Sequence, residues 1–589
     1  MKMKAKKLIG LALSTLLTSN HAFAFADIIV HNAKVTTFDG SNITAFSVKD
    51  GKFEQLSHDA DTLLKNKQAH TQIIDAKGKR IIPGLNDSHL HVVRGGRFYN
   101  LETRWEGITS LKEALSLLSQ QAKRTPKGQW VRVIGGWSPY QFEEKRMPTV
   151  SELNEAVPDN PAFVLFLYSG GLLNKAGMQA LGINKDSKAP KGSRYQRDSS
   201  GQPSGMLIAD PNPAILYQTI SALPQLNPRQ QYNSSIQFYR KLLSLGVTSA
   251  IDAGGGGHQF PNNYQASTDL ALNGELPIRV SKYLFPQQPQ QELNQFKSWM
   301  TGYQREQNQH SDFDSGYVIE GGGELLVWSA SDYENFTSKR PEMAANAEKE
   351  LEAVVRLHLN NRWPFRLHAT YNETINKMLT VLEKINETQP LTKVRWFFDH
   401  GETISDDNLI RLKALGGGIA IQGRLAFAGE DFLARYGSEQ TRRSPPIKKM
   451  LALNIPVGLG TDGTRVSSFN PWSTYYWVVS GKTIGGTQLY DERNILDRLT
   501  ALKLFTLGSA WFSGEEEVKG AIKVGMYADF SILNQDIFTV DEKKLLQTQA
   551  EMTVVNGKVK FATREFGAYA TPALKALPAW SPVNFSGNE

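Results

Sequence analysis

The architecture of this chain is set by Arg80-Ile-Ile-Pro-Gly-Leu-Asn-Asp-Ser-His-Leu-His-Val-Val-Arg94. This segment begins with β-branched apolar residues, is interrupted by Pro83-Gly84, and then carries two histidines at positions i and i+2. Successive side chains of a strand point to opposite faces, so we expect His89 and His91 to project to the same side. Two imidazoles on one side of a strand end can share a divalent metal ion. The alternative is a pair of strand-end histidines that bind no ligand.

The N-terminal segment has the features of a targeting signal. Four lysines precede an uncharged apolar run, Leu8 to Leu17, which is followed by Ala22-Phe23-Ala24 and Ala24-Phe25-Ala26. This order predicts that residues 1–26 are a secretory signal peptide, cleaved after Ala24 or Ala26, and therefore a periplasmic or secreted protein. The alternative is an uncleaved membrane anchor, but the apolar run is short for a bilayer.

Composition narrows the class of protein. The 589 residues exceed one ordinary domain, and 40% hydrophobic with 21% charged residues describes a globular protein with a sizeable core. Removing residues 1–26 lowers the net charge from +8 to +4, and no dense Lys/Arg run follows, so we expect no nucleic-acid partner. Cysteine is absent, which excludes thiolate ligands and cysteine nucleophiles.

Short strand-like segments separated by glycine turns occur at both ends of the mature chain. The first set lies in residues 27–82 and the second in residues 519–589, where Asn556-Gly557 is a strong hairpin signal. About 55 residues make a thin independent core, so we predict that the two ends build one composite β-sandwich, with the last residues forming a tail.

Between these ends, residues 83–518 alternate between strand-like and helical patterns. Such alternation favours a parallel α/β fold, most simply a (β/α)8 TIM-like barrel. The predicted strands after the first are 131–135, 161–167, 247–252, 278–284, 317–320, 365–368, 394–400, 418–422 and 455–460. Residues 104–245 exceed one βα unit, and we expect them to contain an insertion over the barrel mouth.

Polar residues follow several of the predicted barrel strands. His89 and His91 end the first strand, His368 and His400 end two later strands, and Asp462 follows another. Barrel enzymes carry their chemistry at these strand ends, so the series predicts a metal site. A bound Zn²⁺ activates water, for which Asp462 is the candidate general base and proton donor. The histidines would complete coordination, and His400 could also stabilise the developing oxyanion.

The chain resembles the amidohydrolase superfamily at two places, Pro83-Gly-Leu-Asn-Asp-Ser-His-Leu-His91 and Gly520-Ala-Ile-Lys-Val-Gly-Met-Tyr-Ala-Asp-Phe-Ser-Ile-Leu533. Within it, the chain is most similar to the amidohydrolase-3 group, which includes YtcJ-like proteins and N-substituted formamide deformylase. Four further motifs occur in the order of that group: Gly136-Trp-Ser-Pro139, Arg146-Met-Pro-Thr149, Gly246-Val-Thr-Ser249 and His368-Ala-Thr-Tyr-Asn-Glu373.

The resemblance implies that His89 and His91 bind one metal ion, that His368 and His400 bind a second, and that Asp462 is a metal-contacting acid/base. It also implies a lysine, often carboxylated, that bridges the two ions. The chain departs from the family here, because Val318 occupies the lysine position in Gly316-Tyr-Val-Ile-Glu-Gly-Gly-Gly-Glu-Leu325. Glu320 lies two residues later and is a candidate substitute ligand. Its alternative is a solvated or hydrogen-bonded strand-end residue.

These features predict an exported metal-dependent amidohydrolase that cleaves a non-peptide C–N bond of an amide, formamide or cyclic amide. Alternatives are an ester or lactone hydrolase, a deaminase, or a catalytically degenerate periplasmic binding protein. The cofactor would be one or two divalent ions, with Zn²⁺ the first candidate. Trp137, Tyr168, Ser169 and Arg424 are candidates for the pocket wall around a small-molecule substrate, each with a structural role as the alternative. We expect no membrane anchor after signal cleavage, and the resemblance is compatible with a homo-oligomer.

Overall fold

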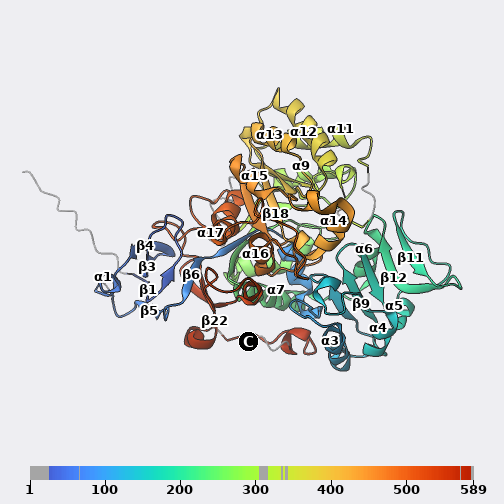
Figure 1. The fold of residues 1–589 in the computed structure, drawn as a ribbon, viewed down its shortest axis with the longest axis horizontal. Helices are drawn as coiled ribbons and strands as arrows, with labels where there is room; N and C mark the ends of the chain where they lie inside the picture. The colour runs from blue at the N-terminus through green and yellow to red at the C-terminus, as the bar shows by residue number, and fades with distance from the viewer. Residues whose placement is uncertain are drawn as a thin grey trace, which may run out of the picture.

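The computed structural model describes residues 26–65, 67–303, 316–332, 336–337, 342–570 and 572–585. A central barrel is flanked along the long axis of the molecule by two smaller β regions (Figure 1). One of them is built from the two ends of the chain, and the other is an inserted sheet on the opposite side. The predicted signal peptide, residues 1–26, lies outside the described residues apart from Ala26.

The barrel is an eight-stranded parallel sheet in the order β19-β18-β17-β16-β15-β14-β13-β7. Its strands are β7 (Leu85–Leu90), β13 (Val247–Asp252), β14 (Arg279–Leu284), β15 (Tyr317–Gly322), β16 (Phe365–Ala369), β17 (Trp396–His400), β18 (Gly418–Gln422) and β19 (Val457–Gly460). Beyond the last strand, the Asp462 N–H donates to the His89 carbonyl at 2.8 Å, which brings the two edges of the sheet together. The predicted (β/α)8 barrel is confirmed.

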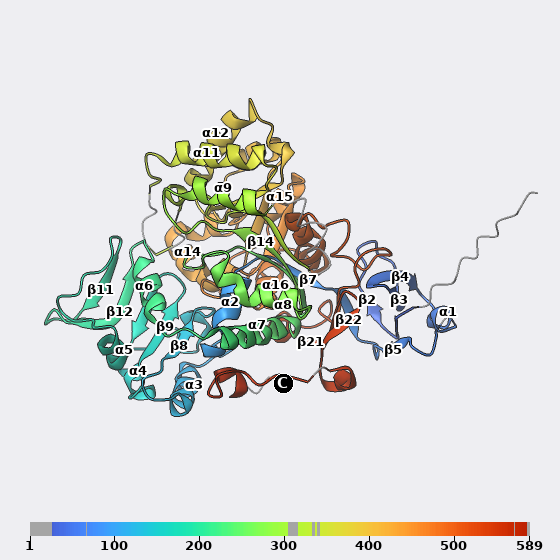
Figure 2. The same ribbon diagram turned by 180° about the vertical axis from the view of Figure 1, so that it is seen from behind.

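Helices surround the barrel on the outside (Figure 2). They include α2 (Val92–Phe98), α7 (Pro228–Leu243), α8 (Gln265–Leu272), α9 (Glu292–Gly302), α11 (Ala347–Asn360), α12 (Asn372–Asn386), α13 (Asp406–Ala414), α14 (Arg424–Thr441), α15 (Ile447–Ala452), α16 (Pro471–Ser480) and α17 (Arg498–Lys503). The start of α7 shows how the local sequence specifies where such a helix begins. Asn227 and Gln230 form a reciprocal capping box, and Pro228 occupies the first helical position.

The two ends of the chain form neighbouring sheets with a shared core, as predicted. One sheet has the order β4-β3-β1-β5 and the other the order β2-β6-β20-β21-β22. Their strands are β1 (Ile28–His31), β2 (Lys34–Val35), β3 (Ala45–Lys49), β4 (Lys52–Ser57), β5 (Gln72–Asp75), β6 (Arg80–Pro83), β20 (Phe530–Leu533), β21 (Ala550–Val555) and β22 (Lys558–Ala562). Phe46 and Phe530 meet edge-to-face in this core, with ring centroids 5.0 Å apart.

The Pro83-Gly84 pair connects this sandwich to the barrel. Pro83 is still paired with Phe530 of β20, whereas the Leu85 N–H already donates to the Gly246 carbonyl at 2.9 Å. Gly84 is required at the crossing, because a Cβ there would lie 2.1 Å from Thr248 Oγ1. The chain therefore passes from one sheet to the other within two residues, which fixes where β7 and its histidines begin.

A separate five-stranded sheet, with the order β11-β12-β10-β9-β8, lies between β7 and β13 in the sequence. Its strands are β8 (Val131–Ile134), β9 (Ala162–Phe166), β10 (Gly170–Leu173), β11 (Ser193–Arg197) and β12 (Pro203–Ala209), and its helices include α3 (Leu111–Arg124) and α6 (Ala214–Ala222). The strands predicted at 131–135 and 161–167 belong to this sheet and not to the barrel. In the described part of the chain, no helix is long and apolar enough to cross a membrane.

Candidate metal centre

The two histidines of the first barrel strand converge inside the barrel. His89 lies in β7 and His91 immediately follows it, and both side chains are buried. Their ring centroids are 5.3 Å apart, as expected for alternate residues on one face of a strand. The predicted convergence of this pair is therefore present in the structure.

The outer nitrogen of each of these two rings is held by the protein. His91 Nδ1 lies 2.8 Å from the Gly254 carbonyl, which can only accept, so Nδ1 carries the proton and Nε2 directs a lone pair inward. His89 Nδ1 lies 3.0 Å from Asp399 Oδ1, and Arg366 Nε donates to the other oxygen of that carboxylate at 2.8 Å. Such outer contacts are typical of histidines that bind metals.

A second pair of imidazoles faces the first from two other strands, β16 and β17, which are adjacent to each other. His368 of β16 and His400 of β17 bring Nδ1 and Nε2, respectively, to within 2.9 Å of each other. His400 has φ of 77°, a left-handed conformation that is strained for a side chain of this size. Such strain is common where the surrounding structure holds a residue for function.

Asp462 lies across the opening between the two pairs. Its Oδ1 lies 3.1 Å from His91 Nε2 and 3.5 Å from His89 Nε2, and its Oδ2 lies 3.9 Å from His400 Nδ1. Like His400, it has a left-handed backbone, with φ of 58°. The carboxylate can therefore reach a ligand held by the first pair and a group above the second.

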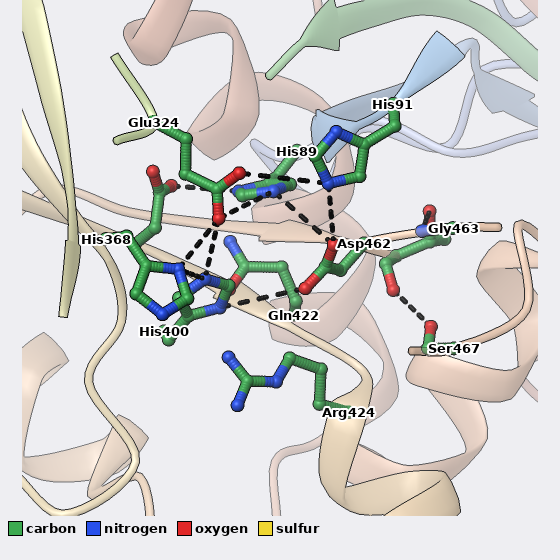
Figure 3. Close-up of polar contacts among 12 residues, drawn as sticks. His89, His91, Glu324, His368, His400, Gln422, Arg424, Asp462, Gly463 and Ser467 are labelled. Carbon is green, nitrogen blue, oxygen red and sulfur yellow. Dashed lines mark hydrogen bonds and ion pairs between the residues drawn. The ribbon is translucent and has the colours of Figure 1, made fainter. Parts of the chain in front are cut away.

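Glu324, which the sequence reasoning did not single out, lies between the two histidine pairs (Figure 3). Its Oε1 lies 2.8 Å from His368 Nδ1 and 3.2 Å from His400 Nε2. The same carboxylate approaches His89 Nε2 and His91 Nε2, each at 3.8 Å. Oε1 is the oxygen near His368, His400 and His89, and Oε2 is the one near His91. The carboxylate therefore reaches ring nitrogens of both pairs, as a ligand that bridges two cations must.

Glu320, the predicted substitute ligand, is not among the residues gathered at this centre. It lines a cavity of about 430 Å³ with Pro364, Arg395 and other residues that precede the barrel strands. The pairing of β14 with β15 skips Glu320, since Lys282 pairs with Ile319 and Tyr283 with Gly321. This bulge breaks the alternation on which the prediction rested. Glu324 takes its place at the centre, from beyond the end of the strand.

The charge states of the centre suit a cation. Burial, and after it the Arg94 guanidinium, lowers the pKa of His91 to about 4. Burial likewise holds the pKa of His400 well below its ordinary value. Burial alone would raise the pKa of Glu324, but the surrounding histidines outweigh it and keep that pKa well below its usual range. These two imidazoles are therefore neutral, and the carboxylate is ionised, near pH 7.

The donor set fits a divalent metal. Two groups of three described side chains can each direct one ligand atom to a common ion: His89, Glu324 and His400; and His89, His91 and Asp462. His89 Nε2 is buried and has no hydrogen-bond partner among the described protein groups, although it faces the middle of the cluster. A buried imidazole nitrogen without a partner is costly unless a ligand completes it.

The predicted wall residues have different places. Trp137 is wholly buried in the core of the inserted sheet, where it packs against Trp105 and its indole N–H donates to the Leu165 carbonyl at 2.8 Å. It is therefore a core residue and not a wall residue. Tyr168, Ser169 and Arg424 line a cavity of about 20 Å³ beside the loop after β19. Figure 3 shows the Arg424 side chain on the same side of the centre as Gln422.

Comparison with known proteins identifies the family. The sequence model of the Amidohydrolase family matches residues 72–561 of this chain. The chain belongs to this family. The amidohydrolase is accordingly a metal-dependent hydrolase that acts on carbon–nitrogen bonds other than peptide bonds, and the match runs from β5 of the sandwich through the barrel to β22.

Individual relatives match the amidohydrolase over most of its length. The protein YtcJ of Bacillus subtilis (strain 168) is 24% identical over 539 residues, which cover 89% of this chain and 97% of that protein. N-substituted formamide deformylase of Arthrobacter pascens is 24% identical over 568 residues and covers 91% and 98%, respectively. An uncharacterized metal-dependent hydrolase from Pyrococcus horikoshii OT3 shares the fold, with a TM-score of 0.61, 21% identity and coverage of 87% of this chain and 99% of that one.

Proposed function

We propose that this amidohydrolase is exported and hydrolyses a small amide, formamide or cyclic amide at a centre of two divalent ions, Zn²⁺ being the first candidate. One observation carries the proposal. The Glu324 carboxylate lies between the His89–His91 pair and the His368–His400 pair, with its oxygens 2.8 to 3.8 Å from their ring nitrogens. Glu324 would contribute to both ion sites. His89, His91 and Asp462 would hold one ion, and His400 would hold the other with His368 beside it.

When bound, divalent ions at this position would lower the pKa of a water molecule and polarise the substrate carbonyl. The side chains of the protein would transfer the protons. Asp462 is placed to accept a proton from the water at its carboxylate and to return that proton to the leaving nitrogen. Its backbone N–H, bonded to the His89 carbonyl, keeps the carboxylate directed at the centre. His400, buried beside it, stays neutral and can complete the ligand set.

Glu324 also bears on the alternatives. The degenerate binding protein was suggested by the valine at position 318, where the family has a bridging lysine. A carboxylate that reaches both histidine pairs from beyond β15 weakens the reason for that alternative. Ester, lactone and amine-releasing reactions use the same groups, and the name of N-substituted formamide deformylase favours the C–N bond of a formamide or related amide.

Export through residues 1–26 is part of the proposal. Ala26 is buried, and its carbonyl accepts a hydrogen bond from Thr71 Oγ1 at 2.8 Å. Cleavage after Ala26 would remove that contact, so these contacts favour cleavage after Ala24. N-terminal sequencing of the protein recovered from a periplasmic extract tests both points, and an uncleaved N-terminus in the cytoplasmic fraction would overturn them.

A hydrolysis screen paired with metal analysis tests the function. The screen offers N-formyl amines, linear amides and cyclic amides, with esters and lactones as a separate arm. We expect the metal-containing protein to hydrolyse members of the amide arm, and His89→Ala to lose metal and activity together. Asp462→Ala should lose about 10²–10⁴-fold in rate per bound metal ion, because the proton-transferring carboxylate is gone. A metal-free and inactive wild-type protein would overturn the proposal, and turnover confined to esters and lactones would replace it with the alternative.

A further inference from the structure

Two buried arginines stand beside the candidate metal centre, each three residues after one of its side chains. Arg94 follows His91 in the first turn of α2, and Arg465 follows Asp462 in the loop after β19. Each is only 3% exposed. A Cβ built on Gly255 would lie 3.0 Å from Arg94 Nη1 and 3.3 Å from His91 Nδ1, so the guanidinium and the imidazole flank the same point.

Two hydrogen-bond donors of the Arg94 guanidinium have no acceptor in the described part of the protein. Its Nε and Nη2 are buried, and neither has an acceptor among the described protein groups. Those two nitrogens form the edge of a guanidinium that pairs side-on with the two oxygens of a carboxylate. Arg80 shows this use elsewhere in the chain, where Nε and Nη2 donate to the two oxygens of Asp536 at 3.0 and 2.9 Å.

Arg465 adds a further buried hydrogen-bond donor from the loop after β19. Its Nη1 has no acceptor in the described part of the chain, and its guanidinium lies over the Tyr217 ring, 5.2 Å from the centroid. The Tyr217 hydroxyl donates to the Tyr168 hydroxyl at 2.8 Å, and Arg94 Nη1 lies 3.5 Å from that same Tyr168 oxygen. The two tyrosines come from the inserted segment, so barrel and insertion together enclose these cations.

Among the described residues, neither of these two cations has a carboxylate in direct contact. Neither arginine has a carboxylate within 4.0 Å among the ion pairs of the described residues, in contrast to Arg366 with Asp399 and Arg279 with Asp529. The acids whose charge influences Arg94 include Asp462 and Glu324, which belong to the metal centre. Glu102 influences both arginines as well, but its ion pair is with Arg104. Buried charges are normally paired, because an unpaired charge loses its hydration without compensation.

We propose that the amidohydrolase takes substrates that carry a carboxylate, and that Arg94 with Arg465 holds this carboxylate next to the bond that is cleaved. This inference rests on the proposed function and specifies its substrate class. N-acylated amino acids and cyclic amides that bear a carboxylate have the required chemistry. Tyr168, which also borders the cavity with Ser169, would contact the substrate between the anion and the scissile amide.

Matched pairs of compounds test the proposal with the metal-loaded protein. Each pair is an N-acetyl amino acid and its carboxamide, in both enantiomers, with glycine, leucine, phenylalanine and glutamate side chains. Binding is measured by calorimetry and turnover by release of acetate, so binding is read even where no hydrolysis occurs. The variants are Arg94→Gln, Arg465→Gln and the charge-conserving Arg94→Lys. The control is Arg132→Gln, because Arg132 is equally buried but donates to the Pro224 carbonyl in the inserted region.

We expect the acids of at least one pair to bind more tightly than the carboxamides in the wild-type protein. Each Gln variant should weaken binding of the acid by about 10–100-fold and leave the carboxamide nearly unchanged, since a charge-assisted hydrogen bond is lost only for the acid. Arg94→Lys should retain part of the preference, and Arg132→Gln all of it. Equal binding of acid and carboxamide throughout the panel, or a preference that survives both Gln variants, would overturn the proposal. Absence of all turnover with the binding preference intact would count against the proposed function alone.

Discussion

Asp399 Oδ1 lies 3.0 Å from His89 Nδ1, although the two residues are 310 positions apart in the sequence. Both side chains are fully buried, and Arg366 donates to Asp399 from the next strand. The contact orients the imidazole so that Nε2 faces the centre of the barrel. The orientation of the His89 ring thus depends on a carboxylate of β17.

Replacing Asp399 by asparagine should weaken metal binding. The substitution keeps the shape of the side chain but removes the charge that fixes the His89 ring, and loss of such an outer contact typically costs about 10–100-fold in metal affinity. Competitive titration with a chelating dye measures the change. Circular dichroism must show a folded protein, because Arg366 is left without its partner. Unchanged metal affinity in the folded variant would contradict this role.

Gly135 should be needed for the loop that carries Asp462 and Arg465. It has φ of 71°, and a Cβ there would lie 2.0 Å from the Arg465 carbonyl oxygen. Gly128 is the matched control, because it has φ of 82° but nothing within 4 Å of its Cβ position. Gly128→Ala should cost about 1–2 kcal/mol of unfolding free energy for the left-handed backbone alone. Gly135→Ala should cost clearly more and lower turnover, as denaturant titration and activity assays would show. Equal losses in the two variants would show that the contact with the loop is unimportant.

The ion pair between Arg80 and Asp536 should join the two ends of the chain in a pH-dependent way. It is bidentate and only partly exposed, with 18% and 15% of the two side chains accessible. Burial would raise the pKa of Asp536, but Arg80 outweighs it and holds that pKa below its ordinary value of 3.8. A depressed folded-state pKa gives stability that is present above pH 3.8 and is lost as the pH falls through the lower value.

Asp536→Asn should therefore lower the unfolding free energy by about 1 kcal/mol at pH 7. The difference from the wild-type protein should shrink as the pH falls below about 4, where the carboxylate of the wild-type protein becomes protonated. Denaturant unfolding of both proteins from pH 7 downward measures this difference. A difference that stays constant with pH would mean that the charge of Asp536 contributes nothing.

Residues at the ends of barrel strands could be predicted from sequence because the fold itself brings them together. The carboxyl ends of parallel strands meet on one face, so His368, His400 and Asp462 required only the correct strands to be placed near His89. The composite sandwich could also be predicted from sequence, since neither end of the chain has enough residues for its own core.

Glu324 could not be predicted in this way, because it lies beyond the strand that positions it. Alternation along β15 favoured Glu320, but the bulge beside Tyr283 shifts the register, and the glycines before Glu324 let the backbone turn into the barrel. Gly323 has φ of 117°, a conformation that side chains rarely adopt. An acid directly after a glycine run at the end of a strand was the available signal. Trp137 was misplaced for a related reason, since periodicity does not show which sheet a strand joins.

The most direct test of the account is the metal content of two glutamine variants from the same segment, Glu324→Gln and Glu320→Gln. Mass spectrometry of the purified proteins, after equilibration with Zn²⁺ and removal of excess metal, gives the number of ions per chain. If Glu324 bridges two ions, the wild-type protein and Glu320→Gln should each hold about two, and Glu324→Gln about one or fewer. Full metal content in Glu324→Gln, or its loss in Glu320→Gln, would contradict the central claim.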